Sequence, residues 1–299
     1  QLYCLNANDG EVLWRFFANA PIRFAPSVSK KKIYFGSDDG FVYCLDAENA
    51  NLIWKYQVAV SNRQVIGNGR MISVQPVRTS VVIDDGILYC CAGIFPSQGV
   101  SAIALNAENG ELIWREKLNG LSPQGYLLTS RNRLYVPTGR TNPFALDKQN
   151  GRYLRSFESS GGSYTLLTDN EIISGPGNDG SLHVSDVHKS DHLATFRGNH
   201  MVITPKMSYL HTDTEISALD RVQLISLRKQ QRQLQDQQES LHQRMESYSE
   251  QAKAIQNQLE NVAQNLEHTK LAIDSCISWK KPCGHPYSLI KAGNLLFAG

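Results

Sequence analysis

Short apolar segments alternate with polar turns along most of the chain. Residues 3–14, YCLNANDGEVLW, form an apolar run, a turn rich in Asn, Asp and Gly, and a second apolar run that ends in tryptophan. Asn, Asp and Gly tolerate the positive φ angles of tight hairpin turns. The same pattern returns as YCLDAENANLIW at residues 43–54 and as IALNAENGELIW at residues 103–114. The sequence therefore predicts a repeated β-hairpin.

Two further strands complete the predicted repeat. FAPSVS at residues 24–29 and KKIYFGS at residues 31–37 precede the second copy, and Asp38-Asp39-Gly40 is another hairpin signal. Trp14 and Trp54 are 40 residues apart, close to the ~40–45 residues of a four-stranded propeller blade. Trp54 and Trp114 are 60 residues apart, and we expect the surplus in a polar, glycine-containing loop at residues 61–76.

Weaker copies follow at residues 144–157 and 182–196, where Phe157 and Phe196 stand two residues beyond the tryptophan position. A sixth copy begins at residue 216 and is interrupted. Four strands cannot bury both of their faces alone, whereas radially arranged blades can. We therefore predict an all-β propeller of four-stranded antiparallel blades. The chain's tryptophans share one repeat position, where we expect each ring to dock against a neighbouring blade: Trp14, Trp54, Trp114 and Trp279.

The two ends of the sequence align with one hairpin of the repeat. NLLFAG at the C-terminus matches KIYFGS, so residues 277–299 are expected to supply the last strands and to close the ring with residues 1–17. That arrangement gives about six blades, and the alternative is an arc of a larger ring. The chain begins with Gln rather than Met, so we expect it to be a piece of a longer protein.

The interruption predicts a helical hairpin. The tryptophan follows the turn Asp or Asn by eight residues in intact copies, but 59 residues separate Asp220 from Trp279. Residues 222–275 contain no Gly or Pro and are rich in helix formers. Because both ends must return to neighbouring strands, we predict two antiparallel helices of about 25 residues. The tip is expected near Ser247-Tyr248-Ser249. The predicted organisation is thus propeller blades at residues 1–220, a hairpin at residues 221–276 and propeller again at residues 277–299.

Apolar residues in the insertion repeat every seven positions, as in a coiled coil. Gln231 and Gln238 are polar breaks in this pattern. One series is Leu227, Leu234, Leu241, Tyr248, Ile255 and Val262; the other is Leu224, Met245, Ala252, Leu259, Leu266 and Ile273.

The repeat resembles the tryptophan-docking pattern A-x-D-x-x-T-G-x-x-x-W of PQQ-like (quinoprotein-type) β-propellers. In the third copy Ala104, Asn106, Asn109, Gly110 and Trp114 match it, with Asn for Asp and Asn for Thr; in the second copy Asp46 and Trp54 match, with Ala50 for Gly. The resemblance covers nearly all of the chain outside residues 221–275. The family contains quinone-dependent dehydrogenases and cofactor-free scaffolds, including the propeller lipoprotein of the outer-membrane assembly machinery. The resemblance implies a bacterial protein of the periplasm or cell envelope.

Enzymatic chemistry has little support in the sequence. Some quinoprotein dehydrogenases cover their cofactor with a disulfide between adjacent cysteines, so Cys90-Cys91 invites that comparison. However, GILYCCAG predicts a strand, in which adjacent side chains point to opposite faces. Adjacent Cα atoms are ~3.8 Å apart, below the usual disulfide range of ~4.4–6.8 Å. The tryptophans are committed to docking and no acidic cluster has ligand spacing, so we expect no catalytic residues and neither PQQ nor calcium.

A metal site and a ligand-binding face are the other candidates for chemistry. Cys276, Cys283, His211 and His285 lack the spacing of a metal site. We expect His183, His188, His192 and His200 to be loop histidines. Arginines and glutamines in irregular stretches would line an anion- or sugar-binding face if these loops share one side of the propeller, and a solvated loop surface is the alternative. The candidates are Arg70, Arg78, Gln124, Arg140 and His285, with Arg63, Gln75 and Gln98 nearby in sequence.

Three function classes are compatible with the sequence. The net charge of +2 does not favour nucleic acid, and no apolar run approaches the length of a membrane helix. The first class is a non-catalytic scaffold for protein binding or assembly, with the helical hairpin or a propeller face contacting a protein partner. The alternatives are a quinoprotein dehydrogenase-like enzyme and a carbohydrate- or anion-binding sensor.

Overall fold

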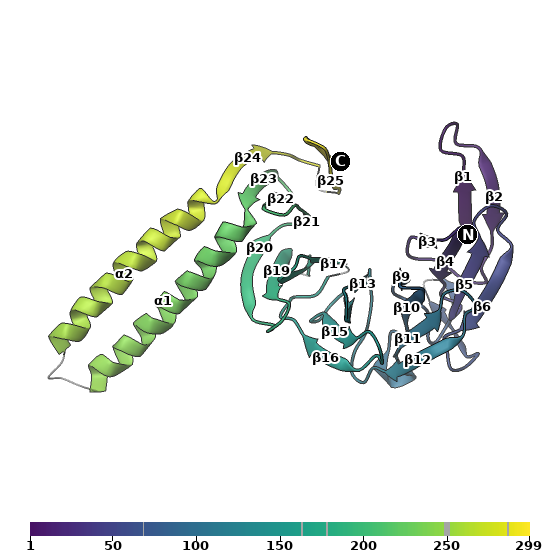
Figure 1. The fold of residues 1–299 in the computed structure, drawn as a ribbon, viewed down its shortest axis with the longest axis horizontal. Helices are drawn as coiled ribbons and strands as arrows, with labels where there is room; N and C mark the ends of the chain where they lie inside the picture. Colours follow the sequence, from purple (N-terminus) through teal and green to yellow (C-terminus); the bar gives the residue numbers. More distant parts are fainter. Residues whose placement is uncertain (68, 163, 178, 248–251, 286) are drawn as a thin grey trace. The chain divides into compact units, whose positions relative to one another are not determined.

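The computed structural model describes residues 1–299 except 68, 163, 178, 248–251 and 286. The chain forms two compact units, Gln1–Asp179 and Gly180–Gly299 (Figure 1). In the described residues, five antiparallel sheets have four strands, and β1 (Leu2–Leu5) pairs with β2 (Val12–Phe16) alone. These sheets are the predicted blades.

Three of the four-stranded sheets lie in the first unit. The first contains β3 (Ser27–Ser29), β4 (Lys32–Gly36), β5 (Phe41–Asp46) and β6 (Leu52–Gln57). The second contains β9 (Val82–Asp84), β10 (Ile87–Ala92), β11 (Ser101–Asn106) and β12 (Leu112–Lys117). The third contains β13 (Leu128–Thr129), β14 (Arg133–Val136), β15 (Phe144–Asp147) and β16 (Tyr153–Ser156).

In the other two four-stranded sheets the strands are also paired in the order in which they occur in the chain. The fourth contains β17 (Tyr164–Leu167), β18 (Glu171–Gly175), β19 (Ser181–Asp186) and β20 (His192–Arg197). The fifth contains β21 (His200–Ile203), β22 (Met207–His211), β23 (Glu215–Asp220) and β24 (Ile277–Pro282). β25 (Leu289–Ala292) pairs with β26 (Leu295–Ala298). Closure of the ring by residues 1–17 and 277–299 stays a prediction.

An Asp or Asn at one position of the repeat forms the hydrogen bonds of each intact hairpin turn. An Asp or Asn side chain accepts the backbone N–H two residues on, and its own carbonyl accepts the N–H four residues on; this closes the turn and places the fourth residue at positive φ. The strand register shifts at a bulge beside each turn. The turn residues are Asn6, Asp46, Asn106, Asp147 and Asp186, and the positive-φ residues are Gly10, Ala50, Gly110, Gly151 and Ser190.

Apolar cores lie between consecutive sheets. One core contains Trp54 and Cys44 from the first four-stranded sheet together with Cys90 from β10. The next contains Cys91 from β10 and Phe144 from β15. Adjacent cysteines on one strand therefore enter two different cores, as the alternation of side chains along a strand requires.

The loop predicted at residues 61–76 contains a β-hairpin instead. β7 (Gln64–Gly67) pairs with β8 (Arg70–Ser73) as a separate two-stranded sheet. The sequence Asn68-Gly69 is a hairpin signal between two apolar pairs. Arg63 and other polar residues around these pairs made the whole segment resemble a loop. A short 3₁₀ helix at Pro96–Gln98 lies between β10 and β11.

Two helices fill the interruption between β23 and β24. α1 (Arg221–Ser247) and α2 (Ala252–Ser275) contact each other along their length and lie side by side (Figure 1). Of the predicted tip, Ser247 is the last residue of α1, and residues 248 and 249 lie outside the described residues. This pair of helices is called the arm below.

The described heptad positions lie on the covered face of the arm, while Tyr248 and the side chain of Ala252 lie outside the description. Buried or half-buried residues recur at intervals of three and four along both helices, and the two polar breaks, Gln231 and Gln238, are half-buried there. The central cluster is apolar and distinct from the cores between the blades. It contains Leu241, Ile255, Leu259, Val262 and Leu266, with Leu234 and Met245 packed against it.

The arm joins its blade without a linker. Asp220 ends β23, and its carboxylate accepts the N–H of Gln223 at 3.0 Å, which caps the first turn of α1. Arg221 is 2% exposed and donates to the Ser208 hydroxyl at 2.9 Å. At the return, Asp220 donates its N–H to the Cys276 carbonyl at 2.9 Å. These bonds fix the root of the arm to β22 and β23.

Candidate functional site

Three tryptophans make one repeated contact. The indole N–H of Trp14 donates to the Ala47 carbonyl at 3.1 Å, and that of Trp54 to the Ala107 carbonyl at 3.2 Å. Trp114 donates to the Lys148 carbonyl at 3.1 Å. Each acceptor directly follows the Asp or Asn that organises the next turn along the chain. The contact thus ties the last strand of one repeat to the turn of the next.

The glycine of the repeat lies against the same ring. A Cβ atom at Gly110 would lie 2.7 Å from the Trp54 ring, and one at Gly151 would lie 2.5 Å from the Trp114 ring. Both glycines also have positive φ, at 76° and 78°. Glycine is therefore required twice over, for the backbone conformation and for the approach of the indole.

The other repeats differ from this arrangement. Trp279 is 38% exposed and its ring centroid is 6.3 Å from that of Tyr209. Phe157 and Phe196 are buried, but the register position of the tryptophan is occupied by Arg155 and Ala194 in their blades. Phenylalanine has no N–H, so these two blades cannot make the indole hydrogen bond.

Arg78, one of the predicted ligand-face residues, is engaged within the first unit. Asp38 is fully buried, and its two carboxylate oxygens accept Nε–H bonds from Arg23 at 2.7 Å and from Arg78 at 2.8 Å. A buried carboxylate needs such partners. Arg78 therefore supports the structure around Asp38, and its part in a ligand-binding face stays a prediction.

The remaining predicted ligand-face residues are spread over several elements. Arg70 is exposed on β8. The Gln124 side chain lies 3.2 Å from where a Cβ at Gly139 would be, one residue before Arg140. Gln124 and Arg140 thus come together in one part of the first unit. His285 is exposed and belongs to the second unit.

Cysteine and histidine residues give no ligand set in the described part of the chain. Cys90 and Cys91 are fully buried free thiols, and burial raises the pKa of Cys90 to about 12. Cys276 donates to the Ala272 carbonyl at the end of α2. No group of three or more His, Cys, Asp or Glu side chains among the described residues is arranged to hold a metal ion. The three indoles donate hydrogen bonds between repeats, and Cys90 and Cys91 lie in separate cores. That the chain binds neither PQQ nor calcium stays a prediction.

The histidine prediction was partly wrong. His183, His192 and His200 lie on strands β19, β20 and β21, and only His188 lies in a turn. His211 is fully buried at the end of β22, where burial and the neighbouring His200 lower its pKa. Alternation of apolar and polar residues in the weak fourth repeat was not strong enough to assign these strands.

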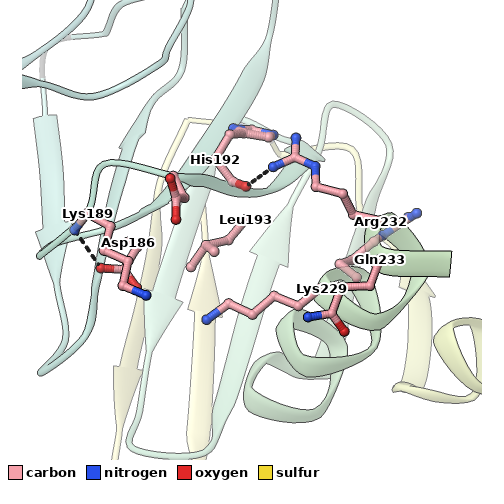
Figure 2. Close-up of a pocket in the computed structure, with 9 residues that line it drawn as sticks. Asp186, Lys189, His192, Leu193, Lys229, Arg232 and Gln233 are labelled. Atoms are coloured by element: carbon pink, nitrogen blue, oxygen red, sulfur yellow. Dashed lines mark hydrogen bonds between the residues drawn. The ribbon is translucent and has the colours of Figure 1, made fainter. Parts of the chain in front are cut away.

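A basic cleft, which the sequence did not predict, lies at the root of the arm. It has a volume of about 410 Å³ between the β19–β20 turn and the first half of α1. Figure 2 shows Lys229 and Arg232 extending from α1 toward that turn. Arg232 donates to the His192 carbonyl at 2.9 Å. The lining residues are Asp186, Lys189, Asp191, His192, Leu193, Arg228, Lys229, Arg232 and Gln233.

Positive charge exceeds negative charge in this cleft. Four Lys and Arg side chains line it against the carboxylates of Asp186 and Asp191. Burial acts to raise the pKa of Asp186, but the N–H groups of Lys189 and His188, with the charge of Lys229, hold it below its usual value. Asp186 thus accepts hydrogen bonds within its own turn, and the cleft keeps an excess of positive charge. The signal in the sequence is local: no acidic residue stands between positions 221 and 235, although the whole chain is nearly neutral.

Comparison with known proteins agrees with the predicted blades. Residues 1–100 match the family model described as outer membrane protein assembly factor BamB. The BamB of Yersinia pestis is 23% identical over 155 residues, which cover 50% of this chain and 36% of that protein. Tetrathionate hydrolase of Acidithiobacillus ferrooxidans is 27% identical over 149 residues, which cover 46% of this chain and 28% of that protein. The matches to these curated relatives span about a third of their length.

Solved structures share the fold at low identity. BamB from Moraxella catarrhalis superposes with a TM-score of 0.53 and 15% identity, covering 70% of this chain and 63% of that one. Quinohemoprotein alcohol dehydrogenase from Comamonas testosteroni superposes with a TM-score of 0.55 and 13% identity, covering 73% and 49%. Together with the repeat geometry, these findings define a β-propeller with an inserted helical hairpin. The chain is similar to PQQ-like β-propeller repeat proteins, and to BamB in particular over residues 1–100.

Proposed function

We propose that the chain is a non-catalytic scaffold of the bacterial cell envelope that holds protein partners during outer-membrane protein assembly. The likeness to BamB supports the envelope and the assembly role. The observation that carries a scaffold role is the arm, whose root is bonded directly to a blade. Among the described residues, no helix is long and apolar enough to cross a bilayer.

The arm is the proposed partner-binding element. Its apolar stripe is occupied by the packing of α1 on α2, so a partner would meet the outer, polar faces of the helices. Leu271 is 63% exposed on α2, and the basic cleft lies beside the root of α1. An acidic partner surface that contacts both the cleft and the arm fits this charge distribution.

Crosslinking in cells tests the role of the arm. A photo-crosslinking amino acid at Leu271 is compared with one at Val28, which is 67% exposed on β3. We expect a discrete crosslinked protein from Leu271 and none from Val28. The proposal is wrong if the two positions give the same background of crosslinks.

Charge reversal tests the acidic partner. Lys229→Glu with Arg232→Glu should weaken the Leu271 crosslink and make it less sensitive to salt, because cations in the cleft are lost. Lys253→Glu, exposed on α2, is the matched control and should leave the crosslink unchanged. A shortened arm lacking residues 235–262 keeps Leu271 and the residues that line the cleft, so it should keep the propeller folded and retain the crosslink. Loss of the crosslink from a folded, shortened protein would place the binding site on the removed part of the arm.

A further inference from the structure

The hairpin β7–β8 has no counterpart in the other repeats as far as the structure describes them, and it exposes apolar side chains. Ile66 is 79% exposed, Met71 52% and Val65 39%. A contiguous exposed apolar patch on a protein surface can mark a binding site. The hairpin also accounts for the surplus residues between Trp54 and Trp114, which the propeller itself does not require.

The base of this hairpin is fixed to the blades. Ser73 donates its N–H to the Asp38 carbonyl at 2.7 Å, and Val74 donates to the Arg63 carbonyl at 3.0 Å. Beyond it, the buried Gln75 side chain accepts the Val60 N–H at 2.7 Å and donates to the Gln98 carbonyl at 2.8 Å. The strands are therefore held in position before any partner arrives.

The outer edge of β7 is free in the described part of the chain, where β7 pairs with β8 only. Because the Ser73 N–H points out of the hairpin, Ser73 and its partner Gln64 form a non-hydrogen-bonded pair. Ile66 and Met71 form the next such pair. The N–H and C=O groups of Gln64 and Ile66 consequently face outward, as a template for another strand.

An apolar cleft adjoins this hairpin. It has a volume of about 220 Å³ and lies between the β7–β8 hairpin and the segment around the 3₁₀ helix. Phe95, 59% exposed, stands at its side, and Arg63 and Gln98 also line it. Its apolar lining residues are Val65, Ile72, Val74, Pro76, Ile94 and Phe95.

The positive charge around the hairpin indicates which kind of segment could bind beside β7. Residues 60–76 contain Arg63 and Arg70 and no acidic residue, and residues 94–98 have no charge. Pairing of this edge with a second copy would bring like charges together, which disfavours self-association. A segment that carries carboxylates between its apolar residues would satisfy both arginines.

We propose that the β7 edge binds an extended segment of a protein partner, with alternating apolar and acidic residues, as an added β-strand. Apolar side chains of the segment enter the cleft, and its carboxylates pair with Arg63 and Arg70. This inference rests on the proposed scaffold function, since it names a second surface for a protein partner. The proposed binding edge contains no residue of the arm.

Peptide binding tests the proposal. The probes are two labelled peptides of about eight residues, one alternating Val with Glu and the other alternating Val with Lys. We expect the Val/Glu peptide to bind about tenfold more tightly or better, and to slow hydrogen exchange of the Ile66 amide. Equal binding of both peptides, or no protection of Ile66, would overturn the proposal.

Variants locate the binding edge. Ile66→Pro removes an outward N–H and leaves the β7–β8 hydrogen bonds intact, so it should weaken binding about tenfold without changing the melting temperature. Ile66→Asp should also weaken it, whereas Ile113→Asp on β12 makes the same change on another blade and should not. Arg63→Glu with Arg70→Glu should shift the preference to the Val/Lys peptide. Wild-type affinity in a folded Ile66→Pro protein contradicts strand addition, and this result does not depend on the crosslinking of the arm.

Discussion

The residues at equivalent turn positions differ in backbone strain, because all of them have positive φ but only some are glycine. The fourth residue after the turn Asp or Asn has a φ of 79° at Gly10, 62° at Ala50, 76° at Gly110, 78° at Gly151 and 69° at Ser190. Glycine adopts this region freely, whereas a Cβ makes it unfavourable. Ala50 and Ser190 are therefore local weak points of an otherwise regular repeat.

We predict that Ala50→Gly raises the free energy of unfolding by about 1 kcal/mol, because it relieves the left-handed strain. Urea denaturation measures the change. Gly110→Ala is the control in the opposite sense and should destabilise the protein, since its Cβ would lie 2.7 Å from the Trp54 ring. If Ala50→Gly lowers the stability, the Ala50 methyl group contributes packing that outweighs the strain.

We predict that Trp54→Ala lowers the free energy of unfolding by ~3–5 kcal/mol, as for buried aromatic residues generally. Trp54 is 9% exposed, lies in the core between two blades and donates a hydrogen bond to Ala107. Trp279→Ala should cost much less because Trp279 is 38% exposed. A melting temperature unchanged by Trp54→Ala would be incompatible with a docking role for this ring.

Sheets are joined to one another by polar contacts as well as by apolar cores. Lys148 is 9% exposed and donates to the Asp84 carboxylate at 2.5 Å, linking the turn after β15 to the end of β9. Lys148 also donates to the Ser130 carbonyl at 3.2 Å. The hydrogen bond from Lys148 is the main cause of a lowered pKa at Asp84.

This pair predicts a loss of stability in acid. The Asp84 carboxyl has a lower pKa in the folded than in the unfolded protein, so its contribution is present above the unfolded value of about 3.9. The contribution disappears as the pH falls through the lowered, folded value. Asp84→Asn should destabilise the protein near neutral pH and flatten its stability between about pH 5 and the acid limit. Urea denaturation at several pH values measures both; an unchanged acid slope would contradict the prediction.

The elements that could be predicted from the sequence are the local ones. The repeated hairpins and the arm follow from turn residues and heptads that lie within a few positions of each other, and the structure contains both. The β7–β8 hairpin was predicted as a loop because its apolar pairs are only two residues long and lie among polar neighbours. The basic cleft combines residues around 186–193 with residues around 228–233. Their proximity depends on the direction in which Asp220 and Arg221 start the arm, which no local pattern encodes.

The molecule as a whole shares its fold with proteins of different chemistry. BamB and a quinohemoprotein alcohol dehydrogenase superpose with similar TM-scores, 0.53 and 0.55. A common fold therefore does not select between a scaffold and an enzyme. In this chain, three indoles donate to backbone carbonyls and the adjacent cysteines Cys90 and Cys91 enter separate cores.

We predict that PQQ with calcium does not stabilise the whole protein. A ligand at 100 times its dissociation constant would add about 2.7 kcal/mol to the stability of the folded state. We expect no shift in the melting temperature when PQQ and Ca²⁺ are added, and no dye reduction with alcohols or sugars. A saturable shift accompanied by substrate oxidation would instead identify an enzyme.

The absence of tryptophan from two blades has a consequence for where new surfaces can arise. Wherever a blade ends in a bonded indole, the next turn must keep an acceptor carbonyl and room for the ring, so it has little freedom to change. The turns that follow Phe157 and Phe196 in the repeat order need not supply an acceptor carbonyl, because phenylalanine donates no hydrogen bond. The turn that begins at Asp186 lines the basic cleft. At the next equivalent position the arm replaces the turn, and Asp220 caps the first turn of α1. In this chain, both turns that follow a blade without the bonded indole therefore carry added structure, a cleft at one and the arm at the other.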